Sequence, residues 1–257
     1  MRKAQQEVTM AQDINEKSFS SEITRIFSKN SLSSYLSMDA ASKFYALTVR
    51  MLEENEKYNL TAITDPSKII LNHYADCVAM AKNFKQGAKI IDVGCGAGFP
   101  TLPLAIVRPD LSIVAMDSTA KRINYVAETA RMLGLSGVRA EVMRAEDAGT
   151  NPEYRERFDY ATARAVAEMR VLSELCLPLV KIGGQMIAMK GKNAEFELSG
   201  AKRAIATLGG RDAKVEEIHL VDEACEIFTH PVIVINKRER TPANYPRAFA
   251  QISKKPL

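Results

Sequence analysis

Three alternate glycines, Gly94, Gly96 and Gly98, follow an apolar run that ends near the carboxylate of Asp92. A strand that enters a glycine-rich turn lets the backbone approach a ligand closely. The GxGxG spacing differs from the GxGxxG of dinucleotide-binding folds, and no lysine follows Gly98 as a phosphate-binding loop requires. Because a carboxylate at Asp92 would repel a pyrophosphate and attract a cationic amine, the loop predicts the amino-acid end of S-adenosylmethionine.

Two further positions predict contacts with the rest of this cofactor. Asp117 ends the next apolar run, where an acid can accept hydrogen bonds from both ribose hydroxyls. The third run leads into Ala145 and Glu146, where adenine recognition is expected. The cofactor contacts expected from these segments are Asp92, Gly94, Gly96, Gly98, Phe99, Asp117, Ser118, Thr119, Ala145 and Glu146. The acids also have a structural interpretation as helix caps, and Ala145-Glu146 has one as plain loop.

The chain alternates strand and helix patterns from residue 89 onward, which supplies a scaffold for these positions. The predicted strands are Lys89–Val93, Ser112–Met116, Arg139–Met143, Asp159–Ala163, Gln185–Met189, Val215–Leu220 and two short runs within residues 226–238. Amphipathic helices are predicted over Ala120–Leu133 and Val166–Val180. This alternation indicates an α/β fold with a parallel sheet and helices on both of its faces.

The ends of the chain differ from this core. Residues 1–20 are polar and expected to fray. From Ser20 to Tyr58 apolar residues recur at helical spacing, which predicts a small helical cap. The sequence therefore divides into a polar segment and cap over residues 1–66, a core over residues 67–236 and a basic tail over residues 237–257.

The composition of the 257 residues argues against several classes of protein. No apolar run approaches about 18 residues, as a membrane-spanning helix would need, and the polar N-terminus has no apolar signal segment. The four cysteines form no CxxC pair, which argues against a zinc site and a disulfide framework. We therefore expect a cytoplasmic protein that binds no metal and inserts into no membrane.

Five segments in fixed order resemble the small-subunit ribosomal RNA methyltransferase G family, also called glucose-inhibited division protein B. They are EKYNLTAITDPSKIILNHYADC, DVGCGAGFPTLPLAIVRPDL, DSTAKRINYV, ATARAVA and LPLVKIGGQMIAMKG. The resemblance covers residues 35–257, and its most specific pieces are Asn59–Ile63, the GxGFP loop and Thr162–Val166. Two departures are Cys95, where the family often has serine or threonine, and Ala248–Gln251, where relatives tend to have a Gly-Thr-Pro-like turn.

The resemblance implies a class I, Rossmann-like methyltransferase with a seven-stranded, mostly parallel sheet behind the helical cap. It implies transfer of a methyl group from S-adenosylmethionine to N7 of a guanine in small-subunit (16S) ribosomal RNA, near the decoding region. Guanine N7 has a free in-plane lone pair, so its attack needs no general base and catalysis rests on placement and electrostatics. In agreement, the sequence lacks both the Asp/Asn-Pro-Pro-Tyr/Phe motif used on exocyclic amines and a Pro-Cys nucleophile.

The resemblance also places Arg164 in the cofactor or guanine pocket, which makes it the catalytic candidate and a further cofactor contact. Methylation puts positive charge on N7, so an arginine touching N7 would oppose the transition state. We therefore expect Arg164 to act at a distance from N7, by holding a cofactor oxygen, guanine O6 or a carboxylate such as Glu146. A purely structural ion pair is the alternative interpretation.

Basic side chains near the expected strand ends predict contacts with RNA phosphates. The candidates are Lys121, Arg122, Lys190, Lys192, Arg240 and Arg247. Residues 236–257 carry six Lys or Arg against one acid, interleaved with Tyr245 and Phe249, which could stack on a base. A solvated, solubilising tail is the alternative. The expected partner is small-subunit ribosomal RNA, a ribosomal subunit or an assembly intermediate, bound by a monomer.

Other interpretations stay open at this point. The same fold could act on another nucleic acid or on a small molecule, and a ribosome-binding assembly factor without catalysis would share these features. A nicotinamide-dependent oxidoreductase is disfavoured by the glycine spacing. His73 and Asp76 lie three apart on a predicted helix and so share a face, where a structural hydrogen bond competes with a functional role. Cys95 is expected to be a small filler.

Overall fold

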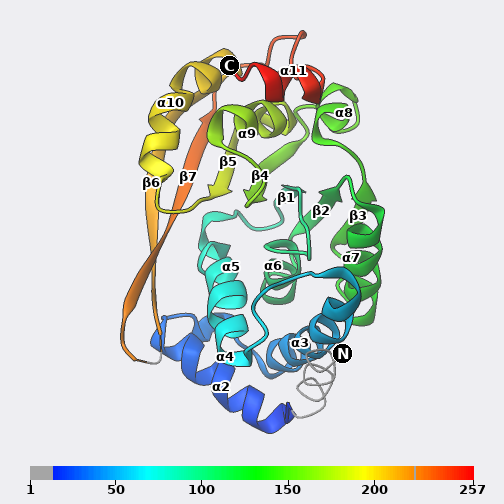
Figure 1. The fold of residues 1–257 in the computed structure, drawn as a ribbon, viewed down its shortest axis with the longest axis vertical. Helices are drawn as coiled ribbons and strands as arrows, with labels where there is room; N and C mark the ends of the chain where they lie inside the picture. The colour runs from blue at the N-terminus through cyan, green and yellow to red at the C-terminus, as the bar shows by residue number, and fades with distance from the viewer. Residues whose placement is uncertain (1–13, 223) are drawn as a thin grey trace.

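The computed structural model describes residues 14–222 and 224–257, and a twisted seven-stranded sheet runs through its centre (Figure 1). The strands are β1 (Lys89–Val93), β2 (Ser112–Asp117), β3 (Val138–Val142), β4 (Phe158–Arg164), β5 (Val180–Met189), β6 (Gly210–Val221) and β7 (Ile227–Lys237). Their order in the sheet is β3-β2-β1-β4-β5-β7-β6, and β7 runs antiparallel to both of its neighbours. The predicted α/β fold with a mostly parallel, seven-stranded sheet is confirmed.

The chain reverses its direction of travel across the sheet between β1 and β4. From β1 the chain adds β2 and β3 on one side, and it then returns to place β4 and β5 on the other. Asp92 of β1 lies beside Thr162 of β4 in the parallel register. Because ligands of open α/β sheets bind outside the carboxyl ends of the strands at such a reversal, the glycine loop and Arg164 both emerge at the expected crevice.

Helices cover both faces of the sheet. On the face that packs against the N-terminal region lie α2 (Glu16–Lys29), η1 (Ser33–Tyr35), α3 (Met38–Tyr58), α4 (Pro66–Ile69), η2 (Ile70–Ala75), α5 (Asp76–Ala79), η3 (Ala81–Asn83), α6 (Thr101–Val107) and α7 (Ala120–Met132). The opposite face carries α8 (Ala145–Thr150), α9 (Met169–Cys176), η4 (Leu177–Leu179), α10 (Ala194–Thr207) and α11 (Phe249–Lys254). Of these, η2 is a π-helix that joins α4 to α5.

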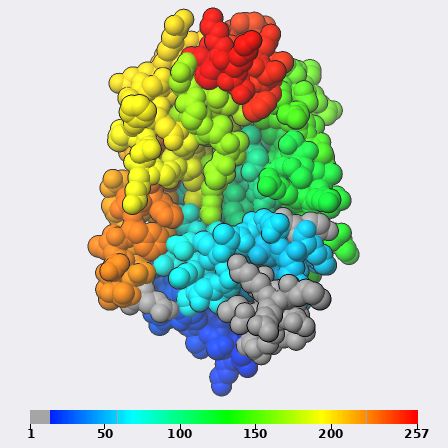
Figure 2. All heavy atoms as spheres, in the orientation of Figure 1, coloured from blue at the N-terminus to red at the C-terminus, as the bar shows by residue number. Residues whose placement is uncertain are grey.

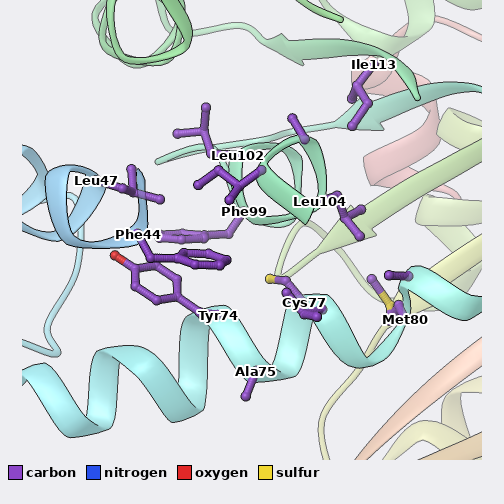
Figure 3. Close-up of a cluster of buried hydrophobic side chains, with 14 of the residues drawn as sticks. Phe44, Leu47, Tyr74, Ala75, Cys77, Met80, Phe99, Leu102, Leu104 and Ile113 are labelled. Carbon is purple, nitrogen blue, oxygen red and sulfur yellow. The ribbon is translucent and has the colours of Figure 1, made fainter. Parts of the chain in front are cut away.

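The N-terminal helices share one hydrophobic core with the sheet (Figure 3). Phe44 of α3 packs against Tyr74 of η2, with ring centroids 4.8 Å apart. The ring centroid of Tyr74 in turn lies 6.3 Å from that of Phe99, the residue that follows Gly98 of the glycine loop. Burial of such aromatic side chains contributes much of the free energy of folding. The helical cap therefore shares one core with the residues that follow the glycine loop and is not a separate lobe.

The boundaries of several elements differ from the sequence-based expectation. The helical cap contains α2 and α3, and α2 begins at Glu16, so the expected fraying up to residue 20 is wrong in its described part. Residues 1–13 lie outside the described residues. The helix predicted over Val166–Val180 is shorter, because α9 ends at Cys176 and β5 already begins at Val180. Pro178, within η4, cannot donate the backbone hydrogen bond that a continuing α-helix needs.

The two short strands predicted within residues 226–238 form the single strand β7, which contains Pro231. The carbonyl of Pro231 accepts a hydrogen bond from the backbone N–H of Lys190, at the point where β5 has ended. In an antiparallel strand the nitrogen of a residue faces the same side as its carbonyl. The missing N–H of Pro231 therefore costs no hydrogen bond to β6, and the strand continues through it.

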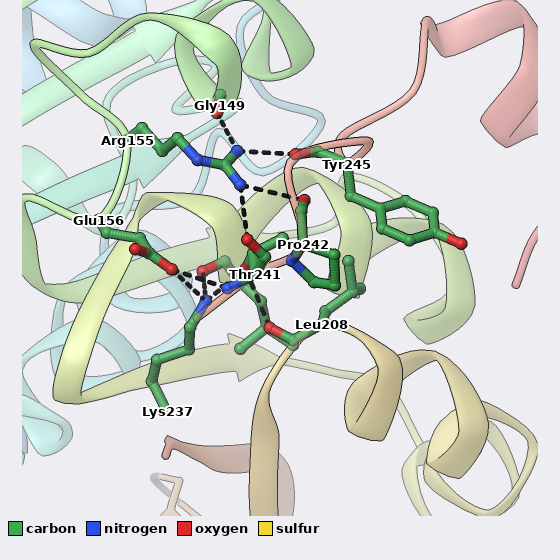
Figure 4. Close-up of polar contacts among 9 residues, drawn as sticks. Gly149, Arg155, Glu156, Leu208, Lys237, Thr241, Pro242 and Tyr245 are labelled. Carbon is green, nitrogen blue, oxygen red and sulfur yellow. Dashed lines mark hydrogen bonds and ion pairs between the residues drawn. The ribbon is translucent and has the colours of Figure 1, made fainter. Parts of the chain in front are cut away.

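The C-terminal tail is packed onto the molecule by buried polar contacts (Figure 4). Lys237, fully buried at the end of β7, donates from Nζ to the carbonyl of Leu177 at 2.7 Å and to the hydroxyl of Thr241, and Nζ lies 3.4 Å from Glu156. Burial lowers the pKa of Lys237 to about 8. The expected boundary between residues 236 and 237 therefore falls inside β7. The first residue after it, Lys237, is buried and donates hydrogen bonds inside the protein.

Two arginines anchor the rest of the tail. Arg247 makes a bidentate contact with Glu174 of α9, at 2.6 and 2.9 Å, and Glu174 is completely buried. Arg170 donates to the carbonyls of Pro256 and Leu257, each at 2.6 Å. The phosphate contact expected of Arg247 does not fit this arrangement, because its guanidinium neutralises a carboxylate that has no access to water.

The ion pair between Arg247 and Glu174 generates a stability prediction. We expect Arg247→Ala to lower the free energy of unfolding by about 3 kcal/mol, because it leaves the buried Glu174 carboxylate without its cationic partner and with only the backbone N–H of residue 247. The matched control is Arg238→Ala, which breaks an exposed pair with Asp212 and should cost less than about 1 kcal/mol. Urea unfolding of both variants checks this, and equal losses would contradict it.

Candidate active site

A cleft of about 290 Å³ opens at the carboxyl ends of β1, β2 and β4. Its lining residues are Val93, Gly94, Met116, Asp117, Ser118, Thr119, Arg122, Met143, Arg144, Ala145, Glu146, Ala165, Val166, Ala167, Leu175 and Phe249. Figure 2 shows this face of the molecule hollowed at its middle, below the red C-terminal segment. The structure therefore brings the residues expected near ribose and adenine into one depression, although they follow two separate strands, β2 and β3.

The glycines of the loop are explained by backbone conformation and by close packing. Gly94 has a φ of +71°, and a Cβ there would meet Val166 Cγ2 at 2.7 Å. Gly96 has a φ of +55°, and its N–H donates to the Asp117 carboxylate at 3.2 Å. Glycine adopts these left-handed conformations without the strain that other residues would incur. The loop thus holds its backbone against both the cleft and the acid at the end of β2.

Asp117 lies at the wall of the cleft with only 6% of its surface exposed. Its Oδ1 accepts from the backbone N–H of Thr119 at 2.8 Å, and Arg122 Nη1 lies 3.6 Å from its Oδ2. These contacts fix the orientation of the carboxylate. Because an ionised carboxylate has about four acceptor positions, Asp117 keeps capacity for hydroxyl donors of a ligand in the cleft.

Asp92, Gly96, Gly98 and Phe99 do not line the cleft, although the sequence placed them among the cofactor contacts. The carboxylate of Asp92 is buried beneath the loop, where it accepts from Thr101 Oγ1 at 2.6 Å and Thr162 Oγ1 at 3.2 Å. Burial raises the pKa of Asp92 to about 6. The structure gives no support to the expected contact of Asp92 with a cationic amine, since Asp92 is only 1% exposed and does not line the cleft.

A second cavity adjoins the cleft and shares Ala165 with it. It is lined by Asp76, Arg164, Ala165, Met189, Lys190, Gly191, Lys192, Glu197, Thr229, His230 and Pro231. Ala165 adopts a φ of +56°, which is uncommon for a residue with a Cβ. Backbone held in such a conformation is frequent at functional sites, and here it forms the wall between the two spaces.

Arg164 lies in the second cavity rather than in the cleft, and it contacts neither Glu146 nor another cleft carboxylate. Its Nη2 lies 2.8 Å from His73 Nδ1, its Nη1 lies 3.4 Å from Asp76 Oδ2, and its guanidinium lies 5.6 Å from the centroid of the Phe99 ring. Because arginine can only donate, Nδ1 of His73 is the acceptor. The sequence foresaw a carboxylate partner, but the partner is Asp76.

His73 is held in one neutral tautomer by this contact. Its Nδ1 accepts from Arg164, so its Nε2 carries the proton and donates to Thr61 Oγ1 at 2.9 Å. Burial, and secondarily the charge of Arg164, lower the pKa of His73 to about 4. His73 lies in the π-helix η2, and π-helical turns are frequent at functional sites. The shared face predicted for His73 and Asp76 is thus used to orient Arg164.

His230 is a residue of this site that the sequence reasoning missed. It lies in β7, and its Nδ1 is 2.7 Å from Asp76 Oδ1. Asp76 is 2% exposed and joins Arg164 to His230 through its two oxygens. The spacing of 154 residues between the two partners left no local signal, although a histidine inside an apolar strand was itself unusual.

A model of the family described as rRNA small subunit methyltransferase G, GidB, matches residues 40–225. The chain belongs to this family. A ribosomal RNA small subunit methyltransferase G from Clostridium perfringens is 44% identical over 221 residues, which are 85% of this chain and 91% of that protein. Its counterpart from Oceanobacillus iheyensis is 46% identical over 224 residues, 86% of this chain and 93% of that protein. The resemblance seen in the sequence is confirmed.

Solved structures share the fold of this methyltransferase G family member at low sequence identity. One from Pyrococcus horikoshii has a TM-score of 0.50 and 17% identity, and the match covers 63% of this chain and 62% of that chain. A SAM-dependent O-methyltransferase from Thermotoga maritima has a TM-score of 0.49 and 17% identity, and that match covers 76% of this chain and 72% of the other. At these identities the likeness concerns the fold alone.

The basic residues expected to contact RNA have different environments. Lys190 pairs with Glu197 at 2.6 Å and donates to the carbonyl of Ala167, whereas Lys192 is exposed, and both line the second cavity. Arg122 lines the cleft, and Lys121 and Arg240 are exposed. Within residues 14–222 and 224–257, no helix is long and apolar enough to span a bilayer, and no cluster of three potential metal ligands occurs.

Asp92 and His73 give opposing pH dependences, and this generates a prediction. Between pH 3.8 and about 6 folded Asp92 holds a proton that the unfolded chain releases, so acidification through Asp92 stabilises the fold. Between pH 6.5 and about 4 the unfolded chain protonates His73 and the folded chain does not, so acidification through His73 destabilises it. In the wild type the two effects partly cancel.

We therefore expect Asp92→Asn to lose more stability than the wild type on acidification, by about 2 kcal/mol between pH 6.5 and about 4.5. Urea unfolding at the two pH values measures the difference. Asp39→Asn, at an exposed position of α3, serves as the control and should behave as the wild type. An unchanged difference in Asp92→Asn would show that the carboxylate is ionised throughout this range.

Proposed function

We propose that this protein transfers a methyl group from S-adenosylmethionine to N7 of a guanine in small-subunit ribosomal RNA. The observation that carries the proposal is the pair of adjoining spaces that share Ala165 at the reversal between β1 and β4. One space has Gly94, Asp117 and Glu146, which suit a cofactor, and the other has cations that suit a nucleotide. The names of the curated relatives, ribosomal RNA small subunit methyltransferase G, support the same substrate class.

The residues of the cleft fit S-adenosylmethionine. Asp117 supplies an oriented carboxylate for the ribose hydroxyls, as acids at the end of the second strand do in related nucleotide-binding folds. Ala145 and Glu146 lie where β3 passes into α8, on the side assigned to adenine. Gly94, which has no side chain and lines the cleft, gives the amino-acid end of the cofactor a close approach to the backbone of the loop. When bound, the cofactor supplies an electrophilic methyl group on sulfur.

The second cavity is proposed to receive the guanine. In the proposed step the N7 lone pair would form a bond to the methyl carbon while the carbon–sulfur bond breaks toward sulfur, so that S-adenosylhomocysteine leaves and no proton moves. The protein therefore has to place N7 in line with the methyl group across the wall at Ala165 and exclude other geometries. Lys192, exposed at the rim of the cavity, is proposed to contact a phosphate of the RNA backbone.

Arg164 is proposed as a positioning residue for this base. His73, Asp76 and Phe99 fix the plane of its guanidinium, so a donor that remains can be aimed at guanine O6. Direct contact with N7 would disfavour the reaction, because N7 becomes positively charged. We also propose, from the sequence alone, that the protein acts as a cytoplasmic monomer on ribosomal RNA, a ribosomal subunit or an assembly intermediate.

The function is tested by incubating the purified protein with S-adenosylmethionine and small-subunit ribosomal RNA or subunits from a strain that lacks the gene. We expect one methylated guanine per RNA, located by mass mapping, and release of S-adenosylhomocysteine. Calorimetry should show binding of S-adenosylmethionine but not of NAD. Binding of NAD without binding of S-adenosylmethionine would refute the assignment.

The role of Arg164 is tested with Arg164→Lys, which keeps the charge but loses the planar fork of donors. We expect single-turnover methylation at saturating cofactor to fall about 100-fold, with cofactor affinity nearly unchanged, because geometry is the contribution of the residue. Arg238→Lys, in an exposed ion pair, is the matched control and should leave the rate unchanged. Near-normal turnover of Arg164→Lys would show that charge alone suffices.

A further inference from the structure

The C-terminal tail supplies one wall of the cofactor cleft. Phe249, the first residue of α11, lines the cleft together with Ser118, Met143 and Ala145. Phe249 is 41% exposed, although Ile252 of the same helix is completely buried. A large aromatic side chain that is left open toward a ligand cleft has an unused face, and aromatic faces stack well on nucleobases.

We propose that Phe249 covers the adenine ring of the cofactor, and that the tail is a cofactor-binding element rather than an arm for RNA. The inference rests on the proposed function, which places the adenosine end where β3 passes into α8. Met143 precedes this junction, and Ala145 and Glu146 follow it, so the ring of Phe249 borders the region assigned to adenine. No segment of the core from residue 67 to 236 supplies an aromatic side chain to the lining of this cleft.

The tail is fixed to the helix that carries the adenine side of the cleft. Arg155 donates to the carbonyl of Gly149 in α8 and to the carbonyl of Tyr245 in the tail, each at 2.7 Å (Figure 4). Pro246 packs closely on Gly149: a Cβ added at Gly149 would lie only 2.6 Å from Cγ of Pro246. Any displacement of the tail would therefore also disturb α8.

Further anchors lie on both sides of Phe249. Before it, Arg247 is bound to the buried carboxylate of Glu174 in α9, a neighbour of Leu175 in the cleft wall. After it, Ile252 is buried and Arg170 holds the carbonyls of Pro256 and Leu257. The position of the ring is thus set before a ligand arrives, which reduces the entropy that binding has to remove.

The same contacts disfavour the alternative in which the tail grips RNA. Arg247 and Lys237, two of the six tail cations, neutralise or satisfy buried groups and are not directed at a phosphate. A base stacked on Phe249 from the RNA would have to enter the cleft that the cofactor occupies. RNA stacking therefore becomes the competing outcome of the experiment.

The test compares Phe249→Ala, Phe249→Leu and Phe249→Tyr in the full-length protein. Phe249→Ala should weaken binding of S-adenosylmethionine, S-adenosylhomocysteine and adenosine by the same factor of about ten, because stacking is lost. Phe249→Leu should lose affinity to a smaller extent, and Phe249→Tyr should bind as the wild type does. Phe196→Ala, on α10 and 82% exposed away from the cleft, is the matched control and should change nothing.

Isothermal calorimetry measures the three ligand affinities, and steady-state methylation separates the roles of cofactor and RNA. We expect a raised KM for S-adenosylmethionine in Phe249→Ala, with kcat and the KM for RNA nearly unchanged. Unchanged cofactor affinity in Phe249→Ala would overturn the proposal, and a raised KM for RNA alongside it would assign the ring to RNA. Failure of the wild type itself to bind S-adenosylmethionine would instead refute the proposed function.

Discussion

The buried carboxylate of Asp92 is the interaction on which the arrangement of both spaces depends. Its two oxygens accept from Thr101 at the start of α6 and from Thr162 of β4, so one side chain of β1 joins three elements at the reversal of the sheet. Because an acid without access to water needs these donors, the pairing of β1 with β4 is specified and not merely allowed. The glycine loop and Arg164 leave the sheet directly beyond this point.

The second space depends on a chain of hydrogen bonds between distant segments. Thr61, His73, Arg164, Asp76 and His230 come from the loop after α3, the helix that spans α4 to α5, β4 and β7, and each contacts the next. A network of this kind is stable only when every buried member is satisfied. His73 can accept a hydrogen bond from Arg164 because it stays neutral, with its pKa lowered to about 4 by burial and by the charge of Arg164. The N-terminal cap thereby takes part in orienting the site.

The sequence predicted those features that local signals encode. Alternating strand and helix patterns gave the sheet, and positions directly after the strands, such as Asp117 and Glu146, lie at the cleft as expected. The role of Asp92 could not be predicted, because it depends on hydroxyls 9 and 70 residues away. The phosphate contact expected of Arg247 rested on a count of charges in the tail. Such a count does not reveal that Arg247 pairs with Glu174, a buried acid 73 residues away.

The two end segments of the chain thus contribute to different spaces, the cap to the cavity proposed for the guanine and the tail to the cleft proposed for the cofactor. The cap acts through Thr61, whose partner His73 in the core orients Arg164, at the side proposed for the guanine, whereas the tail acts through Phe249 at the side proposed for adenosine. An in-line displacement between two ligands requires that both be held at fixed separation, and sub-ångström errors are costly. The reversal between β1 and β4 positions Ala165, where the two spaces meet, but it does not by itself enclose the far end of either space. The tail, anchored by the buried pair between Arg247 and Glu174, borders one end, and Thr61 of the cap reaches the other through its hydrogen bond with His73.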